Sequence, residues 1–305
     1  MLQFISTVLI TSSLSTPHVV GGTPVKPGTW PDAVAVLAAD AACTGTLIAP
    51  DVVLTAGHCI DTHPVVVVVD TVDYGRPGGE PIRVAHALAY PDWQHSYDVG
   101  VVVLEHPAKA RPRAIAAACM VRSGLVEGAM LHLVGFGLIS RAGTGDNSRL
   151  HEGQIPVVDA TCTEDPACNP AVAPGGEFTA GGDGVDSCFG DSGGPVYLDT
   201  TAGPALVGVV SRAYATGGPP CGNGGVYVRA DKVVSWIERV THEKLARTAC
   251  KGAADEGATA DEPAGQSGGC AAGGSGAGLL LAVGAVGLAV RRRRSAGAQP
   301  SQSDN

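Results

Sequence analysis

The stretch Gly190-Asp191-Ser192-Gly193-Gly194-Pro195 is the most informative part of this chain, because it places one serine between glycines and beside a carboxylate. A serine hydroxyl is a weak nucleophile until a base removes its proton. A reactive serine therefore needs an exposed turn, a nearby imidazole and backbone donors for an oxyanion. Glycines on both sides give room for such a turn, although the same residue types most often form an ordinary one.

Two further segments carry the partners that a reactive serine needs. One is Thr55-Ala56-Gly57-His58-Cys59, and the other is Tyr97-Asp98 followed by the apolar run 99–104. Taken alone, His58 would be an ordinary surface or core histidine. Together, in the order His58, Asp98 and Ser192, these segments resemble the trypsin-like serine proteases of the chymotrypsin fold. Further matches are Val19-Val20-Gly21-Gly22, Gly135-Phe136-Gly137, Asp186-Ser187-Cys188 and Gly225-Val226-Tyr227.

The resemblance covers residues 19–245 and implies an all-β fold of two six-stranded antiparallel β-barrels with a C-terminal helix. The composition agrees, because 43 glycines and 21 prolines in 305 residues indicate many turns. Short apolar runs at 65–69, 99–104 and 205–210 predict buried strands between those turns. Apolar residues at helical spacing predict an amphipathic helix over 232–245.

In the mechanism that this resemblance implies, Ser192 attacks the scissile carbonyl of a protein or peptide substrate, and His58 accepts its proton. Asp98 would hold the imidazole, and the backbone N–H groups of Gly190 and Ser192 would form the oxyanion hole. We therefore expect a serine endopeptidase. The alternatives are a catalytically silent homologue that binds a partner and a surface adhesion protein, although a silent homologue usually lacks a member of the triad.

Activation by proteolysis is also implied by the resemblance. In this family a cleavage exposes a new amino terminus, which inserts and pairs with the acid before the nucleophile. Here these groups would be Val19 and Asp191. We therefore expect a zymogen that needs an activating protease. Because His18 precedes Val19 in place of Lys or Arg, the sequence argues against self-activation.

Substrate preference depends on the position six residues before the nucleophile, which lies at the base of the primary pocket in this family. Asp186 occupies it, as in the enzymes that cleave after Arg or Lys. Gly225 would leave space at the pocket wall. The segment Ser211-Arg212-Ala213 departs from the usual Ser-Trp-Gly, so it adds a cation near the mouth and a methyl group where the substrate passes. Alternatively, Asp186 would be only a solvated loop acid.

Charge and composition restrict the partners. A net charge of −9 without a basic stripe in the enzyme region argues against nucleic acid. No cofactor is expected. Asp70, Asp73 and Glu80 lie in a loop where some relatives bind calcium, but solvated acids are the preferred interpretation, and no metal site is expected.

Nine cysteines favour an oxidising compartment. The resemblance pairs Cys43 with Cys59 and Cys188 with Cys221. Cys162 and Cys168 are close enough in sequence for a local bridge. Cys119 is assigned to Cys250 as a guess, which leaves one cysteine, Cys270.

Both ends of the chain differ from the enzyme region. Residues 1–18 read as a signal and a short pro-segment, because 1–15 are apolar with small residues near their end. This stretch lacks a basic start, so the first methionine would lie upstream or export would follow another route. Residues 246–269, rich in Ala, Gly, Asp and Glu, predict a flexible linker.

The segment 270–294 places Cys270 before an uncharged stretch and four arginines at 291–294. This order resembles bacterial sorting tags of the MYXO-CTERM type, which implies a sorting protease acting at Cys270. The uncharged stretch predicts one transmembrane segment, with the arginines and residues 295–305 on the cytoplasmic side. We expect the enzyme to be exported across the inner membrane and to be secreted or held at the cell surface. The alternative is a plain membrane anchor that is not processed.

Overall fold

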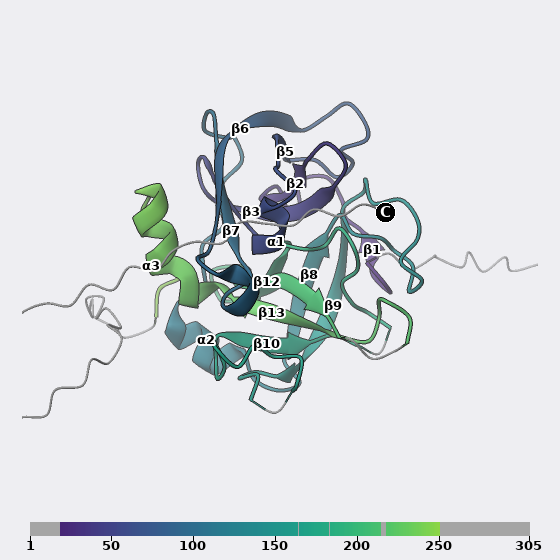
Figure 1. Cartoon of the computed structure of the whole chain (residues 1–305), viewed down its shortest axis with the longest axis vertical. Helices are drawn as coiled ribbons and strands as arrows, with labels where there is room; N and C mark the ends of the chain where they lie inside the picture. The colour runs from purple at the N-terminus through teal and green to yellow at the C-terminus, as the bar shows by residue number, and fades with distance from the viewer. Residues whose placement is uncertain (1–18, 164, 183, 215–217, 251–305) are drawn as a thin grey trace, which may run out of the picture. The chain divides into compact units, whose positions relative to one another are not determined.

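Six antiparallel strands close the first barrel of the computed structural model, which describes residues 19–163, 165–182, 184–214 and 218–250 (Figure 1). Valine-rich segments such as Val66–Val69 form these strands, since β-branched side chains suit a pleated, buried surface. In barrel order the strands are β2 (Ala33–Leu37), β3 (Ala42–Ala49), β4 (Val52–Thr55), β7 (Gly100–Leu104), β6 (Glu80–Ala89) and β5 (Val66–Val69).

The second barrel also has six antiparallel strands and closes through the pairing of β8 with β9. A short strand, β1 (Thr23–Pro24), adds to the edge of β9. In order the barrel strands are β8 (Met130–Gly135), β9 (His151–Asp159), β10 (Glu177–Ala180), β13 (Gly225–Arg229), β12 (Ala205–Ala213) and β11 (Pro195–Leu198). The expectation of two six-stranded barrels with a C-terminal helix is therefore confirmed.

The described helices are short, and they connect barrel strands or follow the last one. The C-terminal helix α3 spans Ala230–Thr241. It starts two residues before the predicted segment 232–245 and ends where His242 adopts a left-handed conformation, with φ 61°. The other helices are α1 (Gly57–Ile60), the 3₁₀ turn η1 (Trp93–His95) and α2 (Ala118–Gly124).

Each barrel has its own apolar core. Fully buried side chains include Leu47, Val53 and Val102 in the first barrel, and Leu131 and Phe178 in the second. Burying such a side chain stabilises the fold by about 1.5 to 3 kcal/mol. The two cores therefore hold the strand ends at which the candidate site is built.

A buried charged cluster supports the packing of residues from both barrels. Arg113 donates from Nε to Asp32 at 2.9 Å and lies over the ring of Tyr197, 4.8 Å from its centroid. The Tyr197 hydroxyl donates to the same carboxylate at 2.7 Å, and its ring stacks on Trp30. Since its charges are paired and hydrogen-bonded, the cluster meets the requirement for buried ions.

The described residues contain four disulfide bridges, and each joins a pair proposed from the sequence. The bridge from Cys119 to Cys250 fixes the last described residues to α2. Just before it, Thr248 donates its backbone N–H to Ile115 at 3.0 Å. The packed part of the chain thus continues past residue 245.

The predicted signal, most of the linker, the sorting tag with Cys270 and the transmembrane segment lie outside the described residues. Among the helices that are described, none has both the length and the apolar character needed to cross a bilayer.

Candidate active site

His58 and Asp98 meet at the ends of two neighbouring strands of the first barrel. His58 lies in α1, directly after β4, and Asp98 lies just before β7, which pairs with β4. The imidazole Nδ1 and Asp98 Oδ2 are 2.9 Å apart, and the His58 backbone N–H donates to Oδ1 at 3.0 Å. A Cβ at Gly57 would lie 2.8 Å from Trp93 and 3.0 Å from Asp98 Oδ1. The glycine before His58 is therefore required by packing.

Asp98 has a second hydrogen-bond donor from the other barrel. The hydroxyl of Ser211, in β12, donates to Asp98 Oδ2 at 2.8 Å. Burial alone would raise the pKa of Asp98. Hydrogen bonds and charge from His58, together with the Ser211 bond, outweigh burial and hold that pKa below its usual range. Asp98 is thus kept as an anion facing the imidazole.

Ser192 belongs to a turn of the second barrel that is anchored to the first. Its carbonyl accepts the backbone N–H of Thr44 in β3 at 3.0 Å. Gly193 has φ +79°, and a Cβ there would lie 2.0 Å from Thr55 Oγ1. The glycine after the serine therefore allows the two barrels to meet at this turn.

His58, Asp98 and Ser192 line one cavity, which has a volume of about 420 Å³. Its wall is mostly apolar, and Phe189 at its edge is 60% exposed. The other lining residues are Trp93, Ser187, Cys188, Val210, Ser211, Arg212, Ala213, Pro220 and Cys221.

The backbone N–H groups of Gly190 and Ser192 are available to a ligand. Gly190 has φ +98°, which favours glycine, and its carbonyl accepts the Thr44 hydroxyl at 2.8 Å. Within the described residues, the N–H groups of Gly190 and Ser192 have no hydrogen-bond acceptor. Buried or partly buried N–H groups normally have one, so this pair is suited to bind an anionic oxygen.

A comparison with known families matches the trypsin family over residues 19–237. The chain belongs to the trypsin family. Members of this family are serine peptidases that act on proteins. The two barrels described above are the fold of the family.

Asp191, which precedes the serine in this trypsin-family domain, is fully buried. It accepts the N–H groups of Gly137 at 2.7 Å and Cys188 at 2.8 Å. Burial raises the pKa of Asp191 to about 7, against the lowering effect of those two donors and with a further rise from the charge of Asp186. No Lys, Arg or His in the described part of the chain forms an ion pair with it.

The segment that begins at Val19 is packed inside the domain. Val19 is fully buried, and the Val20 carbonyl accepts the backbone N–H of Asp186 at 2.9 Å. A Cβ at Gly21 would lie 2.0 Å from the carbonyl oxygen of Gly184. The start of the trypsin-family match thus lies against the segment that leads to Ser192.

Asp186 does not line the cavity, although its neighbour Ser187 does. Its carboxylate is fully buried and accepts four donors, which is about the capacity of two oxygens. Burial raises the pKa of Asp186 above its ordinary value, and the hydrogen bonds to the carboxylate offset part of that increase. The donors are Ser187 N at 2.8 Å, Gly222 N at 3.1 Å, Gly224 N at 2.7 Å and the Tyr227 hydroxyl at 3.4 Å.

The wall residues lie differently from their sequence-based interpretation in one respect. Ser211 and Ala213 line the cavity, and a Cβ at Gly225 would lie 3.4 Å from Ser187 Oγ, in the cavity wall. The cation of Arg212, however, is paired with Glu177, a fully buried carboxylate that the sequence analysis did not consider. In the sequence, Glu177 could have been noticed only as an acidic residue at the start of an otherwise uncharged strand.

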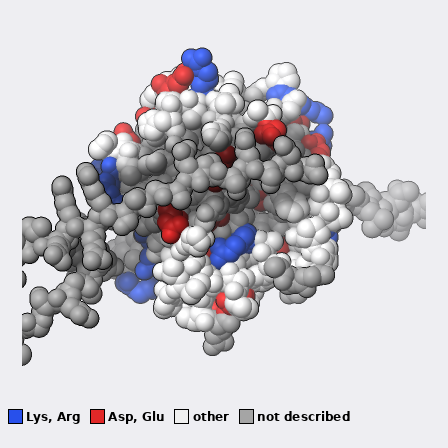
Figure 2. All heavy atoms as spheres, viewed as in Figure 1, with Lys and Arg blue, Asp and Glu red and all other residues white. Residues whose placement is uncertain are grey.

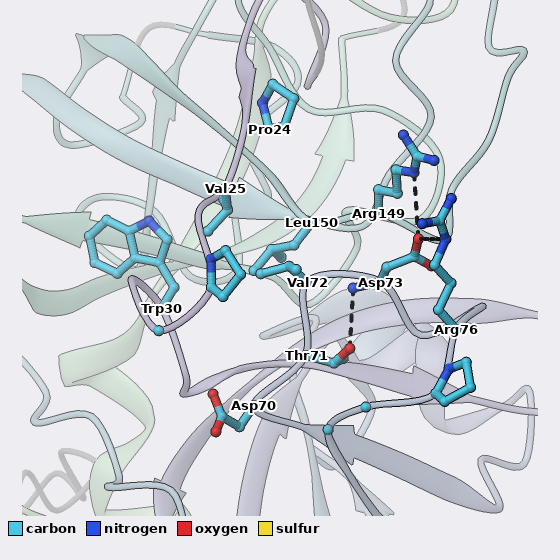
Figure 3. Close-up of a pocket in the computed structure, with 15 residues that line it drawn as sticks. Pro24, Val25, Trp30, Asp70, Thr71, Val72, Asp73, Arg76, Arg149 and Leu150 are labelled. Carbon is cyan, nitrogen blue, oxygen red and sulfur yellow. Dashed lines mark hydrogen bonds and ion pairs between the residues drawn. The ribbon is translucent and has the colours of Figure 1, made fainter.

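A second cavity, of about 450 Å³, lies beside the acids for which calcium was considered (Figure 3). There Asp73 forms ion pairs with Arg76 at 3.1 Å and Arg149 at 3.5 Å. Glu80 accepts the backbone N–H of Lys109 at 2.9 Å. These two carboxylates are thus occupied by protein donors.

On the face seen in Figure 2, acidic and basic side chains are scattered among uncharged ones.

Proposed function

We propose that this protein is a serine endopeptidase that uses His58, Asp98 and Ser192 as its catalytic triad. The observation that carries the proposal is the 2.9 Å contact between His58 Nδ1 and Asp98 Oδ2, at a cavity that Ser192 also lines. The other imidazole nitrogen, Nε2, is then left to act as the base toward the serine hydroxyl.

Each step can be assigned to an atom of this chain. Ser192 Oγ attacks the peptide carbonyl and passes its proton to His58 Nε2, which later returns it to the leaving amine. Asp98 fixes the tautomer and stabilises the imidazolium. The N–H groups of Gly190 and Ser192 bind the oxyanion, and each donor of this kind contributes roughly 3 to 4 kcal/mol to transition-state stabilisation.

Covalent labelling tests the proposal against its alternatives. A chain spanning residues 19–305 is expected to react with an organophosphate at one serine, Ser192, and to lose its peptidase activity in the same proportion. A silent homologue or an adhesion protein would not be labelled there. Labelling that is absent, or found only at other serines, contradicts the triad.

We propose that the uncut chain is a zymogen, activated when another protease cleaves ahead of Val19. Support comes from Asp191, which is buried without a cation among the described residues, and from the buried position of Val19. A new ammonium group at Val19 would provide the missing charge.

We propose cleavage after Arg or Lys, supported by the negative charge of Asp186 next to Ser187 in the cavity wall. A second preference, for apolar side chains, is favoured by the apolar lining and by the four donors already bound to Asp186. A cationic substrate would have to replace some of those donors.

Matched peptides that differ only at the residue before the cut decide between the two preferences. If Asp186 recognises the substrate, kcat/KM is highest for Arg and Lys, and Asp186→Asn lowers it for these two by roughly tenfold to a hundredfold while the Phe and Ala peptides change little. Fastest cleavage after Phe, unchanged in the variant, would establish the apolar preference instead.

For location, we propose export across the inner membrane to the surface or the medium, which the four disulfides favour. The tag at 270–294 would hold the protein in the membrane until a sorting protease acts at Cys270. Mass spectrometry of the mature protein tests this: an end near Cys270 is expected, and an intact arginine cluster at 291–294 contradicts processing.

A further inference from the structure

Arg212 lies in the wall of the cavity, but its guanidinium is directed to acceptors inside the protein. An arginine has five N–H donors, and the structure gives this one five hydrogen bonds. Two go to Glu177, at 2.7 and 2.9 Å, and two go to the carbonyl of Ala167, at 3.2 and 2.7 Å. The fifth runs from Nη1 to the hydroxyl of Ser211 at 3.1 Å. No donor is left for a substrate.

Glu177 balances the charge of this arginine. Its side chain is fully buried, whereas that of Arg212 is 36% exposed. The carboxylate also accepts the backbone N–H of Asn169 at 2.7 Å. The Asn169 side chain in turn donates to the carbonyl of Ser96, two residues before Asp98, at 2.9 Å. Hydrogen bonds from the Arg212–Glu177 pair and from Asn169 therefore connect β12, the segment 167–169 and the segment that carries Asp98.

The bond to Ser211 determines where the Ser211 proton points. A hydroxyl has one proton to donate, and an arginine can only donate. Since Arg212 Nη1 occupies a lone pair of the Ser211 oxygen, the Ser211 proton is left to point to Asp98 Oδ2, 2.8 Å away. The same Oδ2 faces His58 Nδ1.

We propose that Arg212 is a positioning residue for the triad: paired with Glu177, it orients the Ser211 hydroxyl toward Asp98 and so holds the carboxylate that holds His58. This inference rests on the proposed peptidase function. It assigns Arg212 a role in turnover and no hydrogen bond to the substrate, because its five donors are already bound.

A double-mutant comparison tests whether Arg212 acts through Ser211. Removing the arginine alone would leave Glu177 buried and unpaired, so E177Q serves as the matched background. It keeps an oxygen acceptor for Asn169 and leaves the bond from Arg212 to Ser211 in place. We expect R212M to lower kcat on the order of tenfold in that background. When S211A is also present, R212M should change kcat by less than about twofold, because the group through which it acts is gone.

A second readout reports on the imidazole itself. The low-field proton resonance of His58 Nδ1–H is expected to shift with R212M where Ser211 is present and to stay in place where Ala replaces it. An equal loss of kcat in both backgrounds, or no loss with Ser211 present, overturns the inference. KM is not the criterion, since Arg212 is one of the residues that line the cavity.

The comparison of R212K with R212K/S211A repeats the test with Glu177 unchanged. Lysine keeps the charge but has three donors and no fixed fork, so the same dependence on Ser211 is expected. Organophosphate titration of active sites separates the two proposals. If the variants label fully but the effect of R212K on kcat does not depend on Ser211, only the role of Arg212 is contradicted and the peptidase proposal stands. An unaltered chain that neither labels nor hydrolyses overturns both.

Discussion

Replacing Ser192 by Ala is expected to lower kcat by roughly 10⁵-fold or more, because it removes the nucleophile and leaves only binding and the oxyanion donors. The measurement is peptide hydrolysis by residues 19–305 and by the variant, at equal protein concentration. His58→Ala should cause a loss of similar size, and the double variant should be little worse than either single one, since the two residues act as a unit.

The fold should tolerate the Ser192 change. The hydrogen bond that anchors the turn uses the backbone carbonyl of Ser192, which accepts Thr44 N–H at 3.0 Å and is unaffected by alanine. The melting temperature should therefore change by no more than about 2 °C, as is usual when no buried contact is lost. Turnover that survives in a well-folded variant would refute the assignment of the nucleophile.

The second large effect concerns the amino terminus. A chain that keeps residues ahead of Val19 is expected to have a kcat/KM roughly 10²- to 10³-fold below that of the chain starting at Val19. The reason is that a buried ion pair with Asp191 would be missing, and leaving one buried partner unpaired costs about 3 to 5 kcal/mol. Equal activity of the two chains would contradict activation by cleavage.

The pH dependence of stability follows from the pKa of Asp191. In the uncut chain this pKa is raised to about 7, above the ordinary value of 3.8, so the folded protein binds a proton that the unfolded chain releases. This group's contribution to stability is therefore fully present below pH 4 and is lost as the pH rises through about 7. In the chain starting at Val19, the ammonium should lower that pKa and remove the loss, until the amine itself deprotonates at alkaline pH.

Thermal unfolding between pH 4 and 8 checks this difference. Both chains should carry S192A, so that self-digestion does not interfere, and D191N in the uncut chain is the control that should flatten its profile. Identical profiles for the cut and uncut chains would show that Val19 does not pair with Asp191.

The resemblance carried by a few ordered motifs was sufficient to predict the two barrels and the relation of His58 to Asp98, and local patterns located some of the strands. The valine run 66–69 forms a strand because β-branched residues pack well on a pleated surface, and Gly57 and Gly193 stand where a Cβ would collide. The four disulfides were also found, including the bridge assigned as a guess. Two of these bridges were implied by the family resemblance, and Cys162–Cys168 by the short spacing of its cysteines.

The interactions that sequence reasoning missed depend on strand register. Arg212 lies opposite Val226, and Glu177 lies opposite Val228, so the two charged residues flank β13 from opposite sides. No sequence spacing gives that pairing, and Arg212 was therefore interpreted as a free cation. In the same way, the four donors that surround Asp186 come from backbone and tyrosine groups up to 41 positions away in sequence.

The bridge between Cys119 and Cys250 sets the outcome of accidental nicking near the end of the domain. Lys244 and Arg247 follow α3, and the Lys244 side chain is 90% exposed, so both are open to a protease that cuts after basic residues. A break at either one leaves the downstream chain joined to α2 through sulfur. Shedding of the enzyme from whatever follows residue 250 thus requires reduction or a cut farther along the chain.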